Sequence, residues 1–180
     1  LIIGGLSFVT GLWLVYEGTW HHSKTAFFAF IILGILSLIA AYFYTAGKKS
    51  YGYIGLGDLF VFLFFGLLPV AGVFYLNAGR LPAAVFLPAL SIGFFSTGVL
   101  NLNNIRDIEN DRNSGKITIP VRLGARNSRI YHTFLITGGW VAAIMFNAIH
   151  FQSYWQLIYI ITLPVFVVDL ISVFRIQNDK

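Results

Sequence analysis

The residues best suited to chemistry lie in one polar stretch, residues 101–116. Within it, Asn103, Asp107 and Asp111 recur every four residues. On a helix, steps of four place side chains on one face, roughly 6 Å apart along the axis. Proteins typically hold Mg²⁺ through one or two carboxylates, and substrate phosphates complete the shell. The two carboxylates and the amide at that spacing suit a bridging Mg²⁺–diphosphate site rather than a closed metal cage.

The position of these acids supports that interpretation. Asp107, Glu109 and Asp111 follow a long apolar run, so they lie where the helix dipole disfavours negative charge by about 0.3–1 kcal/mol each. The alternative is a solvated polar end of a membrane helix. Because the local rule is broken three times in five residues, we favour a functional site. Cations suited to bind a polyanion are interleaved with the acids: Arg106, Arg112, Lys116 and Arg122.

A second candidate segment, residues 44–58, precedes the third apolar run. Tyr44 and Lys48 are four residues apart, which would place them on one helical face. They either bind the same ligand as the acids or form an interfacial belt of tyrosine and lysine. Asp58 begins the next apolar run and is most simply a helix N-cap. Late in the last run, Asp169 is expected to be solvated and only loosely paired with Arg175.

The elements that must position these residues are membrane spans. Hydrophobic residues make up 57% of the 180 residues, charged residues only 11%, and the mean hydropathy is +0.77. Soluble domains carry about 25% charged residues, so the fold class predicted is all-α, a multi-span transmembrane bundle of one domain, residues 1–180. A span needs about 20 apolar residues. Six spans are expected: residues 1–16, 25–45, 59–79 (kinked at Pro69), 81–105, and two within 130–168, divided by the polar residues 150–156.

The basic residues give the expected orientation. Ten of the 12 lysines and arginines fall in the second loop, the fourth loop and the C-terminal tail, and two, Lys24 and Arg80, fall in the opposite loops. By the positive-inside rule the ten are cytoplasmic, so we predict a plasma (inner) membrane protein whose site faces the cytoplasm. Topology therefore explains the +5 charge, and no nucleic-acid partner is expected. The absence of cysteine excludes disulfides and thiolate chemistry.

Several motifs resemble those of the UbiA prenyltransferase superfamily over nearly the whole chain. The run Asn103-x-x-x-Asp107-x-x-x-Asp111 with Gly115-Lys116 is similar to the family's second acidic motif, and Tyr44-x-x-x-Lys48 to a motif two helices earlier. The segments 53–66, 104–109 and 120–124 are similar to the branch that uses 1,4-dihydroxy-2-naphthoate. The resemblance adds Tyr53 and Asp58 to a predicted substrate-binding set of Tyr44, Lys48, Arg106 and Lys116.

The resemblance implies an Mg²⁺-dependent prenyltransferase, with Asp107 and Asp111 as catalytic, metal-binding acids and Asn103 as a third metal ligand. The substrates would be a polyprenyl diphosphate and 1,4-dihydroxy-2-naphthoate, giving demethylmenaquinol with loss of CO₂ and diphosphate. Two alternatives are another branch of the family, using 4-hydroxybenzoate or haem, and a cation-coupled transporter. The family has nine helices and a first acidic motif after its second helix. The present chain would then hold six of the nine and lack that motif, so we expect the 180 residues alone to be inactive.

Overall fold

The computed structural model describes residues 2–45 and 51–175, and every regular element in these two ranges is helical. Six helical stretches are long and apolar enough to cross a membrane, which confirms the all-α multi-span class. The elements in chain order are α1 (Ile2–Thr19), α2 (Lys24–Thr45), η1 (Tyr51–Tyr53), α3 (Gly57–Val61), η2 (Phe62–Leu67), α4 (Leu68–Ala78), η3 (Ala83–Val85), α5 (Phe86–Arg106), α6 (Ile108–Asn113), α7 (Ile119–Ile149), η4 (Tyr154–Thr162) and α8 (Leu163–Arg175).

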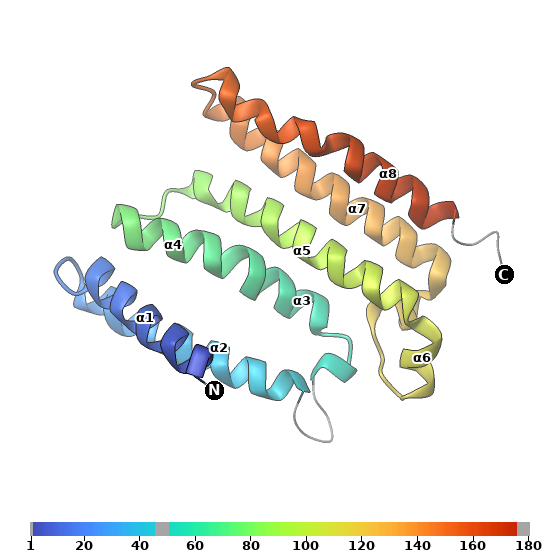
Figure 1. Ribbon diagram of the computed structural model, residues 1–180, viewed down its shortest axis with the longest axis horizontal. Helices are drawn as coiled ribbons and strands as arrows, with labels where there is room; N and C mark the ends of the chain where they lie inside the picture. The colour runs from blue at the N-terminus through green and yellow to red at the C-terminus, as the bar shows by residue number, and fades with distance from the viewer. Residues whose placement is uncertain (1, 46–50, 176–180) are drawn as a thin grey trace.

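The spans lie side by side as a row rather than as a closed ring. α8, α7, α5 and the α3–η2–α4 span follow one another across the molecule, and α1 and α2 lie beyond α4 (Figure 1). The short helix α6 lies where α5 ends, and α2 and α8 also finish toward that end (Figure 1). We call this the α6 end of the bundle; the α1–α2 and α4–α5 connections lie at the opposite end. The candidate acids are therefore carried at one end of the central helix.

Small residues let α5 pack closely against its neighbours. A Cβ added at Gly66 in η2 would lie 2.2 Å from the Cα of Gly93 in α5. On the other side, Ser91 donates a hydrogen bond of 2.8 Å to the carbonyl of Gly139 in α7. Close backbone approach at small residues is the usual means of association between helices in lipid, where there is little hydrophobic driving force. Most of the buried residues lie on α5 and α7, and many large apolar side chains on all the spans are exposed, as expected of helices in lipid.

Substituting Gly66 by valine is expected to destabilise the bundle strongly. The new side chain would meet backbone atoms of Gly93, which have no rotamer by which to move aside. Overpacking typically costs about 1–3 kcal/mol, and we expect the upper end of that range or more. Thermal unfolding of the detergent-solubilised protein measures the effect. Gly5→Val is the matched control, because nothing lies within 4 Å of a Cβ there; equal melting temperatures would contradict the close packing.

The third span changes helical pitch at Phe62–Leu67, which form a π-helical turn. Pro69, where we expected a kink, lies in the first turn of α4 directly after it. Proline has no N–H to donate to the carbonyl four residues earlier. The hydrogen bond that Pro69 cannot donate is therefore missing at the junction of the π-helical turn and α4, not in the middle of a regular α-helix.

The fifth span begins earlier than its apolar run. The expected start was Ile130, but α7 runs from Ile119, with Thr118 as N-cap and Pro120 in the first turn. Arg122, expected in a loop, therefore lies on the helix. The reason is local, because a capping residue and a proline in the first turn favour the start of a helix whether or not the residues that follow are hydrophobic. Gly124 interrupts the helix with φ 74° and ψ 166°, so the first turn stands apart from the long membrane segment.

Candidate functional site at the α6 end

The helix that carries the acids breaks at the first of them. α5 ends at Arg106, and Asp107 stands between α5 and α6 with φ −99° and ψ 11°. The backbone bonds from Asp107 N to Asn103 O and from Asp111 N to Asp107 O, 3.1 and 2.8 Å, keep the four-residue pattern across the break. The expectation of one continuous helix was wrong, but the three residues still follow one another by about one turn each. Asn103 is exposed.

Asp107 is paired with its neighbour Arg106. The guanidinium Nε and Nη2 donate to the two carboxylate oxygens at 2.9 and 3.0 Å, and the Asp107 side chain is 41% exposed. This hydrogen-bonded partner lowers the pKa of Asp107 below its usual range. The carboxylate therefore stays ionised at neutral pH, as a metal ligand must. Arg106 and Asp107 thus form a two-bonded ion pair at the end of α5.

Asp111 is the more protected acid. Its side chain is 10% exposed, and Lys116 Nζ lies 3.1 and 3.2 Å from its two oxygens. The turn that makes this contact is closed by backbone bonds from Ser114 to Asn110 and from Lys116 to Asp111. Gly115, with φ 73°, takes the left-handed conformation that the turn requires. Each candidate acid is thus matched with one candidate phosphate-binding cation.

The two candidate loops meet at the α6 end. Ile117 N donates to Tyr53 O at 2.9 Å, and Arg122 Nη2 donates to Ile54 O at 2.7 Å. Gly55 lies between them with φ 84°, and a Cβ there would approach the Ile117 carbonyl at 2.9 Å. The contact places the backbone of residues 53–55 against the turn that follows Asp111. The Tyr53 side chain itself is 47% exposed.

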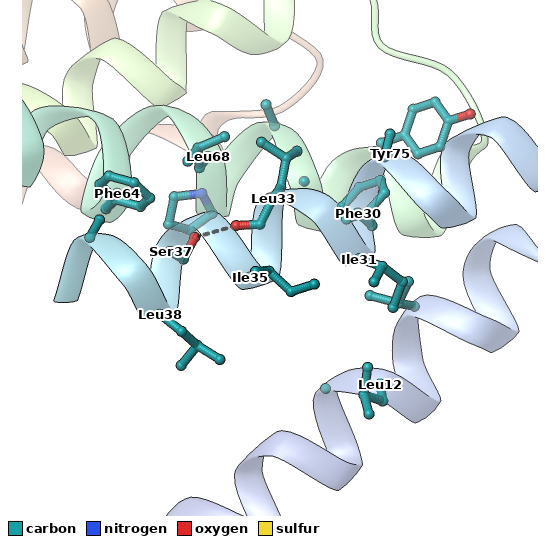
Figure 2. A pocket seen from close by; sticks show the side chains of 18 of the residues that line it. Leu12, Phe30, Ile31, Leu33, Ile35, Ser37, Leu38, Phe64, Leu68 and Tyr75 are labelled. Carbon is teal, nitrogen blue, oxygen red and sulfur yellow. Dashed lines mark hydrogen bonds between the residues drawn. The ribbon is translucent and has the colours of Figure 1, made fainter. Parts of the chain in front are cut away.

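An apolar groove of about 1290 Å³ runs between α1, α2 and the η2–α4 segment, and Tyr44 lines it. Figure 2 shows Phe64 and Leu68 facing Leu33 of α2, with Leu12 of α1 across from them. Tyr44 stands toward the α6 end, where its hydroxyl is about 4.0 Å from a Cβ built on Gly57. Neither Asp107 nor Asp111 lines the groove. Lys48 lies outside the described residues.

Asp58 is not the helix cap that we expected. The N-cap of α3 is Leu56, which makes no side-chain cap bond. The Asp58 carboxylate is buried and interacts electrostatically with the phenol of Tyr131 in α7. A tertiary partner 73 residues away has replaced the local one, and no sequence pattern links the two positions. Asp169 differs likewise: His132 Nε2 lies 2.9 Å from its Oδ2, so its partner is on α7 rather than Arg175.

The oxygens at the α6 end fit magnesium by type. Asp107 and Asp111 offer carboxylates and Asn103 an amide, which are the hard ligands that Mg²⁺ prefers. Among residues 2–45 and 51–175, no three His, Asp or Glu side chains converge to enclose a metal. A metal held by Asp107 and Asp111 would need ligands in addition to these carboxylates. The carboxylate and amide oxygens of the site, without thiolates, are of the type that Mg²⁺ prefers.

Six apolar spans, with paired acids and cations at one end of the central span, define a multi-pass membrane protein with a polar site at a helix terminus. The chain belongs to the UbiA prenyltransferase family, whose profile matches residues 1–180. It is 47% identical over 146 residues to a 1,4-dihydroxy-2-naphthoate octaprenyltransferase of Escherichia coli, covering 81% of this chain and 47% of that protein.

A protein of the same name from Haemophilus influenzae is 39% identical over 174 residues, covering 97% of this chain and 56% of the relative. The human UbiA prenyltransferase domain-containing protein 1 is 32% identical over 113 residues, 63% of this chain and 32% of that protein. The chain thus spans about half the length of the two bacterial relatives. No solved structure matches it.

Proposed function

We propose that this chain carries the second half of the active site of a 1,4-dihydroxy-2-naphthoate polyprenyltransferase. The observation that carries the proposal is the matched set of two carboxylates and two cations at the end of α5. There Arg106 holds Asp107 and Lys116 holds Asp111. Its specificity for naphthoate rests on the names of the bacterial relatives, which share 39–47% identity with this chain. The products would be demethylmenaquinol, CO₂ and diphosphate.

The diphosphate of the donor would bind at the α6 end. Asp107 and Asp111, with Asn103, would hold Mg²⁺, which when bound neutralises charge on the departing diphosphate. Arg106 and Lys116 lie within 3.2 Å of the acids, so both cations are close to the proposed diphosphate position. When the diphosphate binds, they would exchange their carboxylate partners for phosphate oxygens. Tyr44, in the last turn of α2, and Lys48 complete the proposed phosphate-binding set. Positively charged groups around the leaving diphosphate would stabilise the negative charge that develops on it.

The polyprenyl chain would lie in the apolar groove. Its walls between α1, α2 and α4 are almost wholly hydrocarbon, and Tyr44 stands at the end nearer the polar loops. A lipid-soluble chain would enter from the bilayer and leave its charged head among the cations. The surrounding side chains would also keep water from the allylic cation formed when the carbon–oxygen bond breaks. The naphthoate ring then forms the new carbon–carbon bond and loses its carboxylate as CO₂.

The proposal also implies an orientation of the bundle in the membrane. With the α6 end in the cytoplasm, the basic residues of that end obey the positive-inside rule, and Lys24 and Arg80 lie at the opposite face. A water-soluble diphosphate product would then be released into the cytoplasm. We propose the plasma (inner) membrane as the location. A partner in addition to donor, acceptor and lipid is not required by the mechanism.

Removal of divalent metal is expected to abolish turnover. We would test this in a chimera in which residues 1–180 replace the matching part of the Haemophilus influenzae relative, which they cover to 56% of its length. Membranes carrying the chimera receive octaprenyl diphosphate and 1,4-dihydroxy-2-naphthoate, and the prenylated product is separated by thin-layer chromatography. Excess chelator should remove activity, and added Mg²⁺ should restore it. Activity that survives complete chelation would rule out the metal-assisted mechanism.

A further inference from the structure

Two parts of the proposed diphosphate site lie on separate segments of the chain. Tyr44 is in the last turn of α2 and lines the apolar groove, whereas the Asp111–Lys116 ion pair belongs to α6 and the turn after it. One diphosphate can contact both parts only if the distance between them is held. The segment that joins them is residues 51–55, which contacts Tyr44 on one side and the start of α7 on the other.

The contact with Tyr44 is made through Gly52, which is buried. A Cβ added at Gly52 would lie 2.8 Å from the carbonyl oxygen of Tyr44 and 3.2 Å from its aromatic ring. The helical turn η1 therefore packs directly against the last turn of α2, with no room for a side chain between them. A shift of residues 51–55 would consequently be transmitted to Tyr44.

On its other side, the segment accepts two hydrogen bonds from the start of α7. Ile117 N donates to Tyr53 O at 2.9 Å, and Arg122 Nη2 donates to Ile54 O at 2.7 Å. The two donors are joined through Thr118, whose carbonyl accepts from Arg122 N at 3.1 Å. Because the two acceptors are adjacent in the chain, the paired bonds restrict both the position and the rotation of residues 51–55.

Gly55 allows the guanidinium of Arg122 to lie against the backbone. Its φ is 84°, a conformation that favours glycine. A Cβ there would lie 3.2 Å from Cζ and Nε of Arg122 and 2.9 Å from the carbonyl oxygen of Ile117. A methyl group at position 55 would therefore disturb both contacts. The planar guanidinium, with N–H donors along its edge, suits a bond to a carbonyl in so narrow a space.

We propose that Arg122 is a positioning residue that sets the distance between Tyr44 and the Asp111–Lys116 ion pair. The inference rests on the function proposed above. The guanidinium is bonded to the carbonyl of Ile54, so Arg122 acts on the diphosphate through the residues that it positions, without contacting it. Loss of this bond should weaken binding of the donor. Binding of the acceptor and the rate of the fully bound complex should be nearly unchanged.

The first test is a double-mutant cycle in the chimera, with initial rates measured at several concentrations of octaprenyl diphosphate and 1,4-dihydroxy-2-naphthoate. Arg122→Gln should raise the donor KM about 10-fold, as for loss of a hydrogen bond from a charged group. Gly55→Ala should act in the same way, because its methyl group would displace the guanidinium. Since both substitutions break one contact, the double variant should resemble the more affected single variant, not show the product of the two effects.

Hydrogen exchange of the substrate-free, detergent-solubilised chimera gives a readout that does not depend on activity. The amide of Ile117 is the reporter, since it is bonded to the Tyr53 carbonyl. Arg122→Gln and Gly55→Ala should each speed exchange at this amide about 10-fold, because they remove a bond that helps to keep the two segments together. Arg126→Gln is the matched control.

Arg126 lies four residues after Arg122, is exposed and carries the same charge. Its substitution should leave the donor KM and the exchange of Ile117 as in the parent. A rise in donor KM equal to that of Arg122→Gln would show that general positive charge at this end is responsible, and the proposal would fail.

Two further results would overturn the positioning role. Multiplicative effects of Arg122→Gln and Gly55→Ala, with Ile117 exchanging as in the parent, would mean that Arg122 contacts the diphosphate itself. Equal rises in both KM values, together with a lower melting temperature, would make Arg122 a packing residue. If the parent chimera forms no prenylated product, the proposed function fails and this role with it, even where the exchange rates confirm the contact.

Discussion

Asp107→Asn in the chimera is expected to lower kcat/KM by about 100-fold or more, whereas Glu109→Gln should leave it within a few-fold of the parent. The asparagine keeps the shape of the side chain but removes the charge that a metal-bound diphosphate needs. Loss of a single preorganised stabilising group commonly costs 10²–10³ in rate. Asp111→Asn should behave in the same way, because its carboxylate is the more buried of the two and already lies against Lys116.

Glu109 is the appropriate control because it shares α6 with Asp111 but not its face. Two residues along a helix correspond to about 200° of rotation, and Glu109 is exposed. Initial rates at several concentrations of each substrate would separate donor and acceptor effects. Comparable losses for Glu109→Gln and Asp107→Asn would show that general charge at the α6 end, rather than a metal-binding face, supports turnover. Melting temperatures close to the parent's would exclude loss of fold as the cause.

Residues 1–180 expressed alone in membranes are expected to form no prenylated product above background. A departing diphosphate carries several negative charges, and Asp107 and Asp111 supply one pair of metal-binding carboxylates. Glu17 lies in α1 toward the opposite end of the bundle, and Asp58 is buried in the third span. The described residues hold no further cluster of acids that could bind a second metal. Metal binding by one pair of carboxylates would leave much of the negative charge that develops on the diphosphate without a counter-charge.

The chimera described above is the positive control for this experiment, since it differs only in carrying the remaining part of the relative. Both proteins should be detected at similar levels in the membrane fraction, so that absence of product reflects chemistry rather than expression. Product formation by the 180 residues alone, at a rate similar to that of the chimera, would mean that one acidic motif suffices. The two-sided neutralisation assumed in our mechanism would then be wrong.

Features that depend on local sequence could be predicted. Runs of uncharged residues identified all six spans, because a bilayer selects for apolar length whatever the tertiary packing. The four-residue spacing identified Asn103, Asp107 and Asp111, and the structure keeps them in successive turns. The hairpin at 150–156 was also predicted; Ser153 and Gln156 form its capping box. The catalytic and metal-binding roles of Asn103, Asp107 and Asp111 stay predictions.

Features that depend on distant partners were not predictable. Asp58 and Tyr131 are 73 residues apart and His132 and Asp169 are 37 apart, so no periodicity links them. The start of α7 was placed too late because we relied on hydrophobicity, whereas Thr118 and Pro120 begin the helix by capping. The docking of Arg122 on the carbonyl of Ile54 likewise depends on how two loops fold together. Such contacts require the helices to be placed first.

The π-helical turn at Phe62–Leu67 determines in which direction the side chains of α3 point relative to those of α4. Such a turn corresponds to one extra residue accommodated in an α-helix, and one residue corresponds to about 100° of rotation. Deleting a single residue from the turn would restore a regular helix and rotate Gly57–Val61 by that angle relative to α4. Asp58 would then point away from Tyr131, although neither residue had changed. Evolution by insertion or deletion at this turn could thus exchange the side chain that the span presents to α7, without altering the groove-lining residues of α4.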